Sequence, residues 1–252
     1  MQHFRSFDDT DIAYIDVGSG PAVLLLHGFA ADHHANWVQP GVVAALVDAG
    51  HRVIAADARG HGSSEKPTDP ARYGGGAMVE DARALLDHRS VDEVHVVGYS
   101  MGSMVALGLV PREPRARTLV LGGIGDGVAR AAPARNSSRI AAALLADDPS
   151  TVTDPLGREF RRFADRTGAD RRAMAAIQQA PMRTGPARPE RIEVPTLVLK
   201  GDHDPLVGSA QGLADRIPGA QLRIVPGNHI TAVSDPGFRG AIVGFLRQQA
   251  AA

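Results

Sequence analysis

A serine flanked by glycines is the residue of this sequence best suited to chemistry. Ser100 stands at the centre of the run Gly98-Tyr99-Ser100-Met101-Gly102. The apolar segment Val94–Val97 before it predicts a strand, and Met104–Leu107 after it predicts a helix. A turn this tight strains its central residue, requires small neighbours and lifts the hydroxyl group clear of the sheet. A serine presented in this way is typical of a nucleophile.

A serine hydroxyl is a weak nucleophile at neutral pH and needs a base, usually a histidine that a carboxylate orients. Two further strand-like runs lead to such residues. Thr196–Gly201 is followed by Asp204, and Leu222–Val225 is followed by His229. Because α/β sheets place functional residues at the carboxyl edge of their strands, we expect Ser100, Asp204 and His229 to meet there.

Two other aspartates could supply the carboxylate. Asp202 lies two residues before Asp204, and Asp126 follows the predicted strand Leu119–Leu121. Asp126 could instead cap or turn the segment that begins there. The positions of these residues along the chain leave all three aspartates open.

The composition is that of an ordinary globular protein. Of the 252 residues, 44% are hydrophobic and 22% charged, and the net charge is −1, so no strong field attracts nucleic acid or an acidic membrane. The absence of cysteine excludes disulfides and thiolate chemistry. Without a signal-peptide pattern or a bilayer-length apolar run, the expected location is cytoplasmic. Almost all of the 27 basic residues are arginines, a bias that favours a bacterial coding sequence.

The apolar runs predict a mostly parallel, doubly wound α/β sheet of about eight strands. An antiparallel hairpin is expected first, formed by Phe4–Phe7 and Ile12–Val17. The later runs are continuous, as in strands buried on both faces: Val23–Leu26, Val53–Ala56, Val94–Val97, Leu119–Leu121, Leu197–Leu199 and Leu222–Val225. Helix-length segments alternate with them and imply right-handed crossovers: Trp37–Ala49, Ala77–Leu86, Met101–Val110, Ala210–Ile217 and Phe238–Gln249.

One long interval breaks this alternation. Between Gly125 and Pro195 no strand pattern occurs, and three helices are expected there. Asp154-Pro155 predicts the start of the second helix as N-cap and first-turn proline, and Asp170 lies near the start of the third. We therefore predict a helical cap, residues 126–191, inserted into an α/β core made of residues 1–125 and 192–252.

Two further motifs accompany the chain order serine, aspartate, histidine. Leu26-His27-Gly28-Phe29 ends the third predicted strand, and Asp57-Ala58-Arg59-Gly60-His61-Gly62-Ser63-Ser64 follows the fourth. With these motifs the chain resembles, over essentially its whole length, a serine hydrolase of the α/β-hydrolase fold family with a helical cap. The resemblance favours Asp204 as the acid, because the aspartate before Pro205 matches the family's pattern. The chain departs from that pattern at Ser103, where relatives often have glycine.

The resemblance also implies a reaction. The backbone N–H groups of Phe29 and Met101 would form an oxyanion hole for a tetrahedral intermediate. The expected activity is hydrolysis of an ester, thioester or lactone of a small organic substrate through an acyl-enzyme, with no metal or organic cofactor. The same triad would serve a C–C bond hydrolase or a perhydrolase or haloperoxidase-type enzyme. A further interpretation is a small-molecule-binding protein of this fold with little turnover.

Aromatic and basic residues provide candidates for substrate contacts. Trp37, Phe160 and Phe163 could line the acyl pocket, although a core role is an equal alternative for each. The many arginines between Arg130 and Arg188 predict a solvated face of the cap. The alternative is that one or two of them steer an anionic substrate.

Four histidines receive structural interpretations. His27 and His61 are expected to hydrogen-bond around the turns near the site. His33 and His34 lack a third ligand at metal-binding spacing, so we expect a solvated loop and no metal there.

Overall fold

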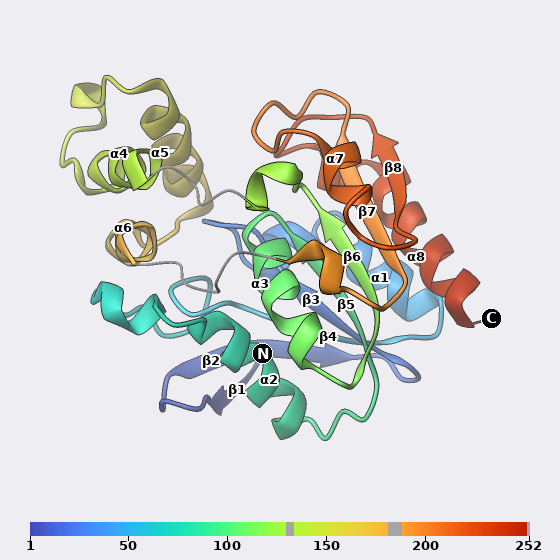
Figure 1. Cartoon of the computed structure of the whole chain (residues 1–252). Coiled ribbons are helices and arrows are strands. Elements are labelled where there is room, and N and C mark those ends of the chain that lie inside the picture. The colour runs from blue at the N-terminus through green and yellow to red at the C-terminus, as the bar shows by residue number, and fades with distance from the viewer. Residues whose placement is uncertain (130–133, 181–187, 251–252) are drawn as a thin grey trace.

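The computed structural model describes residues 1–129, 134–180 and 188–250. Its strands form one eight-stranded sheet in the order β1-β2-β4-β3-β5-β6-β7-β8 (Figure 1). The strands are β1 (Gln2–Arg5), β2 (Asp11–Val17), β3 (Ala22–Leu26), β4 (Arg52–Ala56), β5 (Val94–Tyr99), β6 (Ala116–Gly122), β7 (Thr196–Gly201) and β8 (Gln221–Val225). β2 pairs antiparallel with β1 and with β4, and all other neighbours are parallel. The predicted hairpin and parallel sheet are confirmed.

Helices cover both faces of this sheet. They are α1 (Val42–Asp48), α2 (Ala77–His88), α3 (Met101–Leu109), α7 (Ala210–Ala214) and α8 (Pro236–Ala250). Along β3, Leu24 packs in a cluster with apolar residues of α2, α3 and α7, whereas Val23 and Leu25 pack with those of α1 and α8. Burial on both faces explains why the strands are continuous apolar runs. No helix in the described part of the chain has the length and apolar character to cross a bilayer.

The first predicted helix is interrupted. A π-helical turn spans His34–Val38, and α1 starts only at Val42. Between them lie Pro40, which has no N–H to donate, and Gly41, whose φ of 77° is left-handed. The continuous helix predicted over Trp37–Ala49 was therefore wrong at its start.

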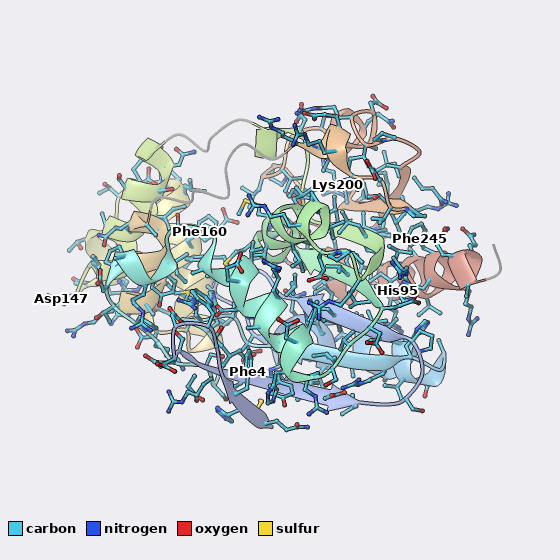
Figure 2. The ribbon with its side chains drawn as sticks, turned by 60° about the horizontal axis from the view of Figure 1, so that its bottom comes forward. Phe4, His95, Asp147, Phe160, Lys200 and Phe245 are labelled. Atoms are coloured by element: carbon cyan, nitrogen blue, oxygen red, sulfur yellow. The ribbon has the colours of Figure 1, made fainter. Side chains whose placement is uncertain are left out.

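Three helices form a separate group beside the sheet: α4 (Ala134–Leu145), α5 (Pro155–Thr167) and α6 (Arg171–Gln179) (Figure 1). As predicted, Asp154 caps α5 by accepting a hydrogen bond from the N–H of Gly157. Asp170 lies at the start of α6, as expected, and caps it. Apolar residues of the three helices share one cluster, which includes Ile140, Met174 and Ile177. Figure 2 labels Phe160 of α5 on this side of the molecule and Phe245 of α8 on the other.

The division into a core and an inserted cap remains a prediction. Parts of the predicted cap, residues 130–133 and 181–187, lie outside the described residues. We use the term cap helices below for α4, α5 and α6 only.

Candidate active site

Ser100 lies in the tight turn between β5 and α3. Its φ of 52° and ψ of −110° are strained for a residue with a side chain. A Cβ atom at Gly98 would lie 2.5 Å from the carbonyl oxygen of Gly102, and a Cβ at Gly102 would overlap the carbonyl group of Leu26. The two glycines are therefore required for the chain to pass through this turn and expose Ser100.

A chain of hydrogen bonds joins the three residues expected to meet. Nε2 of His229 lies 2.9 Å from Oγ of Ser100, and Nδ1 of His229 lies 2.7 Å from Oδ2 of Asp204. An ionised carboxylate can only accept, so Nδ1 carries the proton and donates it to Asp204. Nε2 is then free to accept the hydrogen of Ser100.

Asp204 is the most enclosed member of this chain. Its side chain is 0% exposed, against 18% for His229. Its other oxygen, Oδ1, accepts a hydrogen bond from the N–H of Leu206 at 3.0 Å. Burial works against ionisation, but the hydrogen bond and charge of His229 outweigh it, and the pKa of Asp204 is lowered. The carboxylate is consequently charged at neutral pH and able to orient the imidazole ring.

The other two aspartates have different partners. Oδ1 of Asp202 accepts hydrogen bonds from the N–H of Gly227 at 2.9 Å and from the ring of His203. Oδ1 of Asp126 accepts from the N–H of Ser209 at 2.9 Å. Both carboxylates thus hold loops together, while Asp204 is the one that contacts His229.

The predicted oxyanion donors lie on two segments beside Ser100. Met101 is the first residue of α3, so its N–H has no acceptor within the helix. Phe29 follows Gly28, at which a Cβ would lie 3.5 Å from Cβ of Ser100. Buried Asn36 accepts a hydrogen bond from the N–H of Gly28 at 2.9 Å and so holds this loop in place. Sequence reasoning missed Asn36, because no motif marks it.

Tyr99 is a second residue that sequence reasoning missed as a contact of the site. Its hydroxyl group donates a hydrogen bond to the backbone carbonyl of His229 at 2.6 Å, and the two rings lie 5.7 Å apart. Burial raises the pKa of Tyr99, so the phenol stays protonated and can donate. The residue that precedes Ser100 in the chain is therefore bonded directly to the residue that carries the imidazole ring.

His27 and His61 have the structural roles expected of them. Nδ1 of His27 donates to the carbonyl of Gly28 at 2.8 Å, and its Nε2 accepts from the N–H of Ala58 at 2.9 Å. His61 donates to the carbonyl of Arg59 at 3.1 Å. Burial lowers the pKa of His27, and it lowers the pKa of His61 to about 3. Both rings are neutral and join the turns that flank the site.

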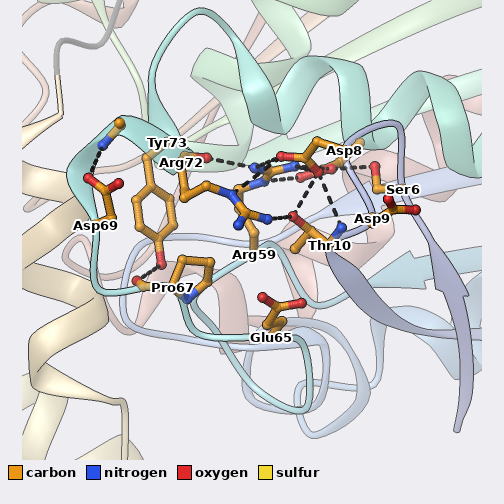
Figure 3. Close-up of polar contacts among 12 residues, drawn as sticks. Ser6, Asp8, Asp9, Thr10, Arg59, Glu65, Pro67, Asp69, Arg72 and Tyr73 are labelled. Atoms are coloured by element: carbon orange, nitrogen blue, oxygen red, sulfur yellow. Dashed lines mark hydrogen bonds and ion pairs between the residues drawn. The ribbon is translucent and has the colours of Figure 1, made fainter.

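Arg59, in the turn after β4, is completely buried. Figure 3 shows its polar contacts. Its guanidinium group donates to both oxygens of Asp8, at 2.9 and 3.0 Å, and to both oxygens of Asp81, at 2.7 Å each. It also donates to the carbonyl of Arg72 at 2.6 Å. This side chain binds the first hairpin to α2 and has no contact with Ser100.

The solvated loop predicted at His33 and His34 is correct for only one of them. His34 is exposed, but His33 is buried, and its Nδ1 lies 2.7 Å from Oδ1 of Asp57. The backbone N–H of His33 donates to the same oxygen at 2.9 Å. The pairing with a buried carboxylate is the reason that this histidine leaves solvent. Within the described residues, no group of three or more potential metal ligands occurs.

The three aromatic candidates for the pocket lie in different surroundings. Trp37 is 0% exposed and belongs to the core cluster with α1 and α8, so its ring offers no surface to a ligand. Phe160 is half-buried and meets the ring of Phe29 edge to face at 5.8 Å. Phe163 is half-buried and lines a cleft that also contains Ile230, the neighbour of His229.

The departure from the family pattern at Ser103 has a local cause. Ser103 is completely buried, and its hydroxyl group donates to the carbonyl of Gly122 at 2.8 Å. The extra hydroxyl group therefore binds α3 to the end of β6.

Comparison with known proteins agrees with this architecture. Residues 21–153 match the family model described as alpha/beta hydrolase fold. The chain belongs to this family. Its relatives in the family include hydrolases.

Individual relatives cover most of the chain. It is 30% identical over 259 residues to a 2-hydroxymuconate semialdehyde hydrolase of Pseudomonas sp. (strain CF600), a match that spans 94% of this chain and 90% of that protein. It is 28% identical over 247 residues to the dihydrolipoyllysine-residue acetyltransferase component of the acetoin cleaving system of Pseudomonas putida, covering 91% of this chain but only 64% of that protein. The structure of a hydrolase from Pseudomonas aeruginosa PA01 superposes with a TM-score of 0.80, at 30% identity and 97% coverage of both chains.

Proposed function

We propose that this protein hydrolyses an ester, thioester or lactone of a small organic substrate, with Ser100 as nucleophile, His229 as general base and Asp204 as the residue that orients it. The observation that carries the proposal is the chain of hydrogen bonds from Ser100 through His229 to the buried Asp204. A strained serine and a charged buried carboxylate on either side of one imidazole have a clear chemical use in acyl transfer.

In the first half of the reaction, Oγ of Ser100 attacks the substrate carbonyl carbon while Nε2 of His229 takes the hydroxyl proton. The carbonyl oxygen becomes negative, and the N–H groups of Phe29 and Met101 would stabilise it. Each such donor is typically worth about 10²- to 10³-fold in rate. The imidazolium then gives its proton to the leaving alcohol or thiol, and the acyl group stays on Ser100.

In the second half, His229 removes a proton from water, and the resulting hydroxide attacks the acyl-enzyme. The tetrahedral intermediate collapses, Oγ of Ser100 recovers the proton from His229, and the carboxylic acid leaves. Throughout, Asp204 keeps Nδ1 protonated and stabilises the imidazolium.

The direct test uses a short p-nitrophenyl ester and a fluorophosphonate probe. We expect the wild-type protein to release p-nitrophenol and to be labelled by the probe, and Ser100→Ala to do neither. Ser103→Ala, which changes a buried serine one turn away, is the matched control and should still be labelled. Equal labelling of the wild-type protein and Ser100→Ala would disprove the proposal.

The similarity to a 2-hydroxymuconate semialdehyde hydrolase favours C–C bond hydrolysis as a second candidate. The same three residues would then act on a carbon–carbon bond next to a carbonyl group. Turnover of such a substrate at a kcat/KM well above that of every ester tried, and lost in Ser100→Ala, would select this candidate.

A further inference from the structure

A cleft of about 560 Å³ lies between α5 and the loop that carries His229. Ile230 forms the wall on the loop side, and the other lining residues come from α5. Ile230 directly follows His229 in the chain, so the loop of the proposed base supplies one wall of the cleft.

Three arginines of α5 line this cleft: Arg158, Arg162 and Arg166. Their four-residue spacing places them on one face of the helix, along about 12 Å of its axis. All three are exposed. Glu159 also lines the cleft, and its single negative charge leaves a positive excess.

These three guanidinium groups have no carboxylate partner among the described residues. Arg161 and Arg139 of the cap helices are paired, with Asp165 and Asp154. Exposed Arg172 of α6 has no such partner among the described residues. Like charges four residues apart destabilise a helix by a few tenths of a kcal/mol per pair. The four-residue spacing thus works slightly against the helix, and no carboxylate of α5 offsets it by pairing with these three side chains.

The position of α5 relative to Ser100 is well defined. At the end of the helix, the hydroxyl group of Thr167 donates to the carbonyl of Ala30 at 2.7 Å, in the loop that carries Phe29. Phe160 packs against Phe29 itself. The arginine face is therefore held at a fixed distance from the proposed oxyanion hole.

The cleft also has an apolar part. Phe163 and Ile230 both line it, and the guanidinium group of Arg166 lies 5.5 Å above the ring of Phe163. This stacking holds Arg166 at the wall through a cation–π contact. A ligand with a short apolar segment that leads to an anionic end matches both features.

We propose that Arg158, Arg162 and Arg166 bind an anionic group of the substrate, a carboxylate or a phosphate, while its acyl carbonyl lies at Ser100. Guanidinium groups suit either anion, since they form paired, charge-assisted hydrogen bonds with its oxygens. The inference rests on the proposed function for the reacting end of the substrate, whereas the anion contact can be measured without turnover.

The test compares two esters of equal length and different charge. The half-ester of glutarate with p-nitrophenol is anionic, and p-nitrophenyl valerate has a methyl group in place of the carboxylate. In R158Q/R162Q/R166Q we expect the ratio of kcat/KM for the half-ester to kcat/KM for the valerate to fall at least roughly tenfold, mainly through KM. Arg162→Glu, at the middle of the face, should lower the ratio by itself.

The matched control is R112Q/R172Q/R223Q, which removes three exposed arginines outside the cleft and the same total charge. The ratio should then stay within about twofold. Butyryl-CoA identifies the source of the anion, because its phosphates lie in the leaving group. If only kcat/KM for butyryl-CoA falls relative to the valerate in the triple variant, the recognised anion lies in the leaving group. If only kcat/KM for the half-ester falls, the recognised anion lies in the acyl part.

Binding separates this inference from the proposed reaction. Titration of Ser100→Ala with monomethyl glutarate should give a Kd that rises at least about tenfold when the three cleft arginines are also replaced. If the protein binds monomethyl glutarate in this way but the wild type turns over no ester, the proposed reaction is disproved and the anion site is supported. Turnover with an unchanged ratio for both anionic substrates, and an unchanged Kd, would disprove the anion site and keep the reaction.

Discussion

Arg59 and the three arginines of α5 that line the cleft represent opposite uses of the same side chain. Arg59 is completely buried and donates hydrogen bonds to both carboxylates that face it, those of Asp8 and Asp81. Arg158, Arg162 and Arg166 are exposed, lie on one helix face and have no such partner among the described residues.

The difference shows how the surroundings of an arginine distinguish a structural role from a ligand-binding one. A buried charge is tolerated only when it is paired and hydrogen-bonded, so the partners of Arg59 account for it fully and mark it as structural. A face of unpaired like charges beside a cleft lacks such an internal explanation. Their position beside the cleft leaves these guanidinium groups available to a ligand, which is the basis for the anion site.

The largest effect is expected from removing the base that serves substrates of either charge. His229→Ala should lower kcat at least roughly 10⁴-fold for the half-ester and for the valerate alike. Binding of monomethyl glutarate should persist, because the arginines remain. His203→Ala, whose side chain is 83% exposed in a neighbouring loop, is the control and should keep its activity. A His229→Ala variant with near wild-type kcat would show that the imidazole takes no part in the reaction. A wild-type protein that binds the ligand without turnover would favour the binding-protein interpretation.

Replacing Arg59 is expected to lower stability strongly, whereas replacing a cleft arginine of α5 is expected to change it little. Arg59→Gln removes the guanidinium partner of the buried carboxylate of Asp81 and of the half-buried carboxylate of Asp8, and should lower the free energy of unfolding by about 3–5 kcal/mol. Arg162→Gln should change it by no more than about 0.5 kcal/mol. Urea denaturation of both variants measures these values. Equal losses in the two variants would show that the exposed face is structural as well.

The smallest effect on activity is expected at Tyr99. This buried residue contacts His229 from the core, so it is neither a purely structural residue like Arg59 nor a cleft residue. Tyr99→Phe removes the donor to the carbonyl of His229 and should cost about 1 kcal/mol, seen as a fall in kcat of up to roughly fivefold. The preference between half-ester and valerate should not change. Tyr73→Phe is the control, since it loses a similar bond, to the carbonyl of Pro67, away from His229 (Figure 3). A change in charge preference in Tyr99→Phe would place the phenol near the anion instead.

Most of the fold could be predicted because the central strands are buried on both faces and alternate with helices. That burial produces continuous apolar runs, and all of the predicted parallel strands occur in the sheet. The start of α1 was missed, because the pattern of apolar residues does not register the effect of Pro40 and Gly41 on the backbone. Asp154 and Asp170 were found, since a cap acts on N–H groups only two or three residues away.

The positions that could be named for the site were those with local causes. The glycines around Ser100 are dictated by a close approach of neighbouring backbone, which leaves a pattern in the chain. Asn36 and Tyr99 act on loops that are near only after folding, and no spacing rule points to them. The burial of Trp37 and His33 likewise follows from packing and from the carboxylate of Asp57, which a linear reading does not place.

The tight turn around Ser100 and the order of the strand ends follow directly from the amino acids, since glycine positions and apolar runs act over a few residues. The contact of Asp204 with His229, which Asp202 and Asp126 do not make, was decided by the folded arrangement. So was the lack of carboxylate partners, among the described residues, for the cleft arginines of α5. The bonds from His229 reach 25 residues to Asp204 and 129 residues to Ser100. Contacts over such separations depend on strand order and on how helices pack, and these are properties of the whole chain.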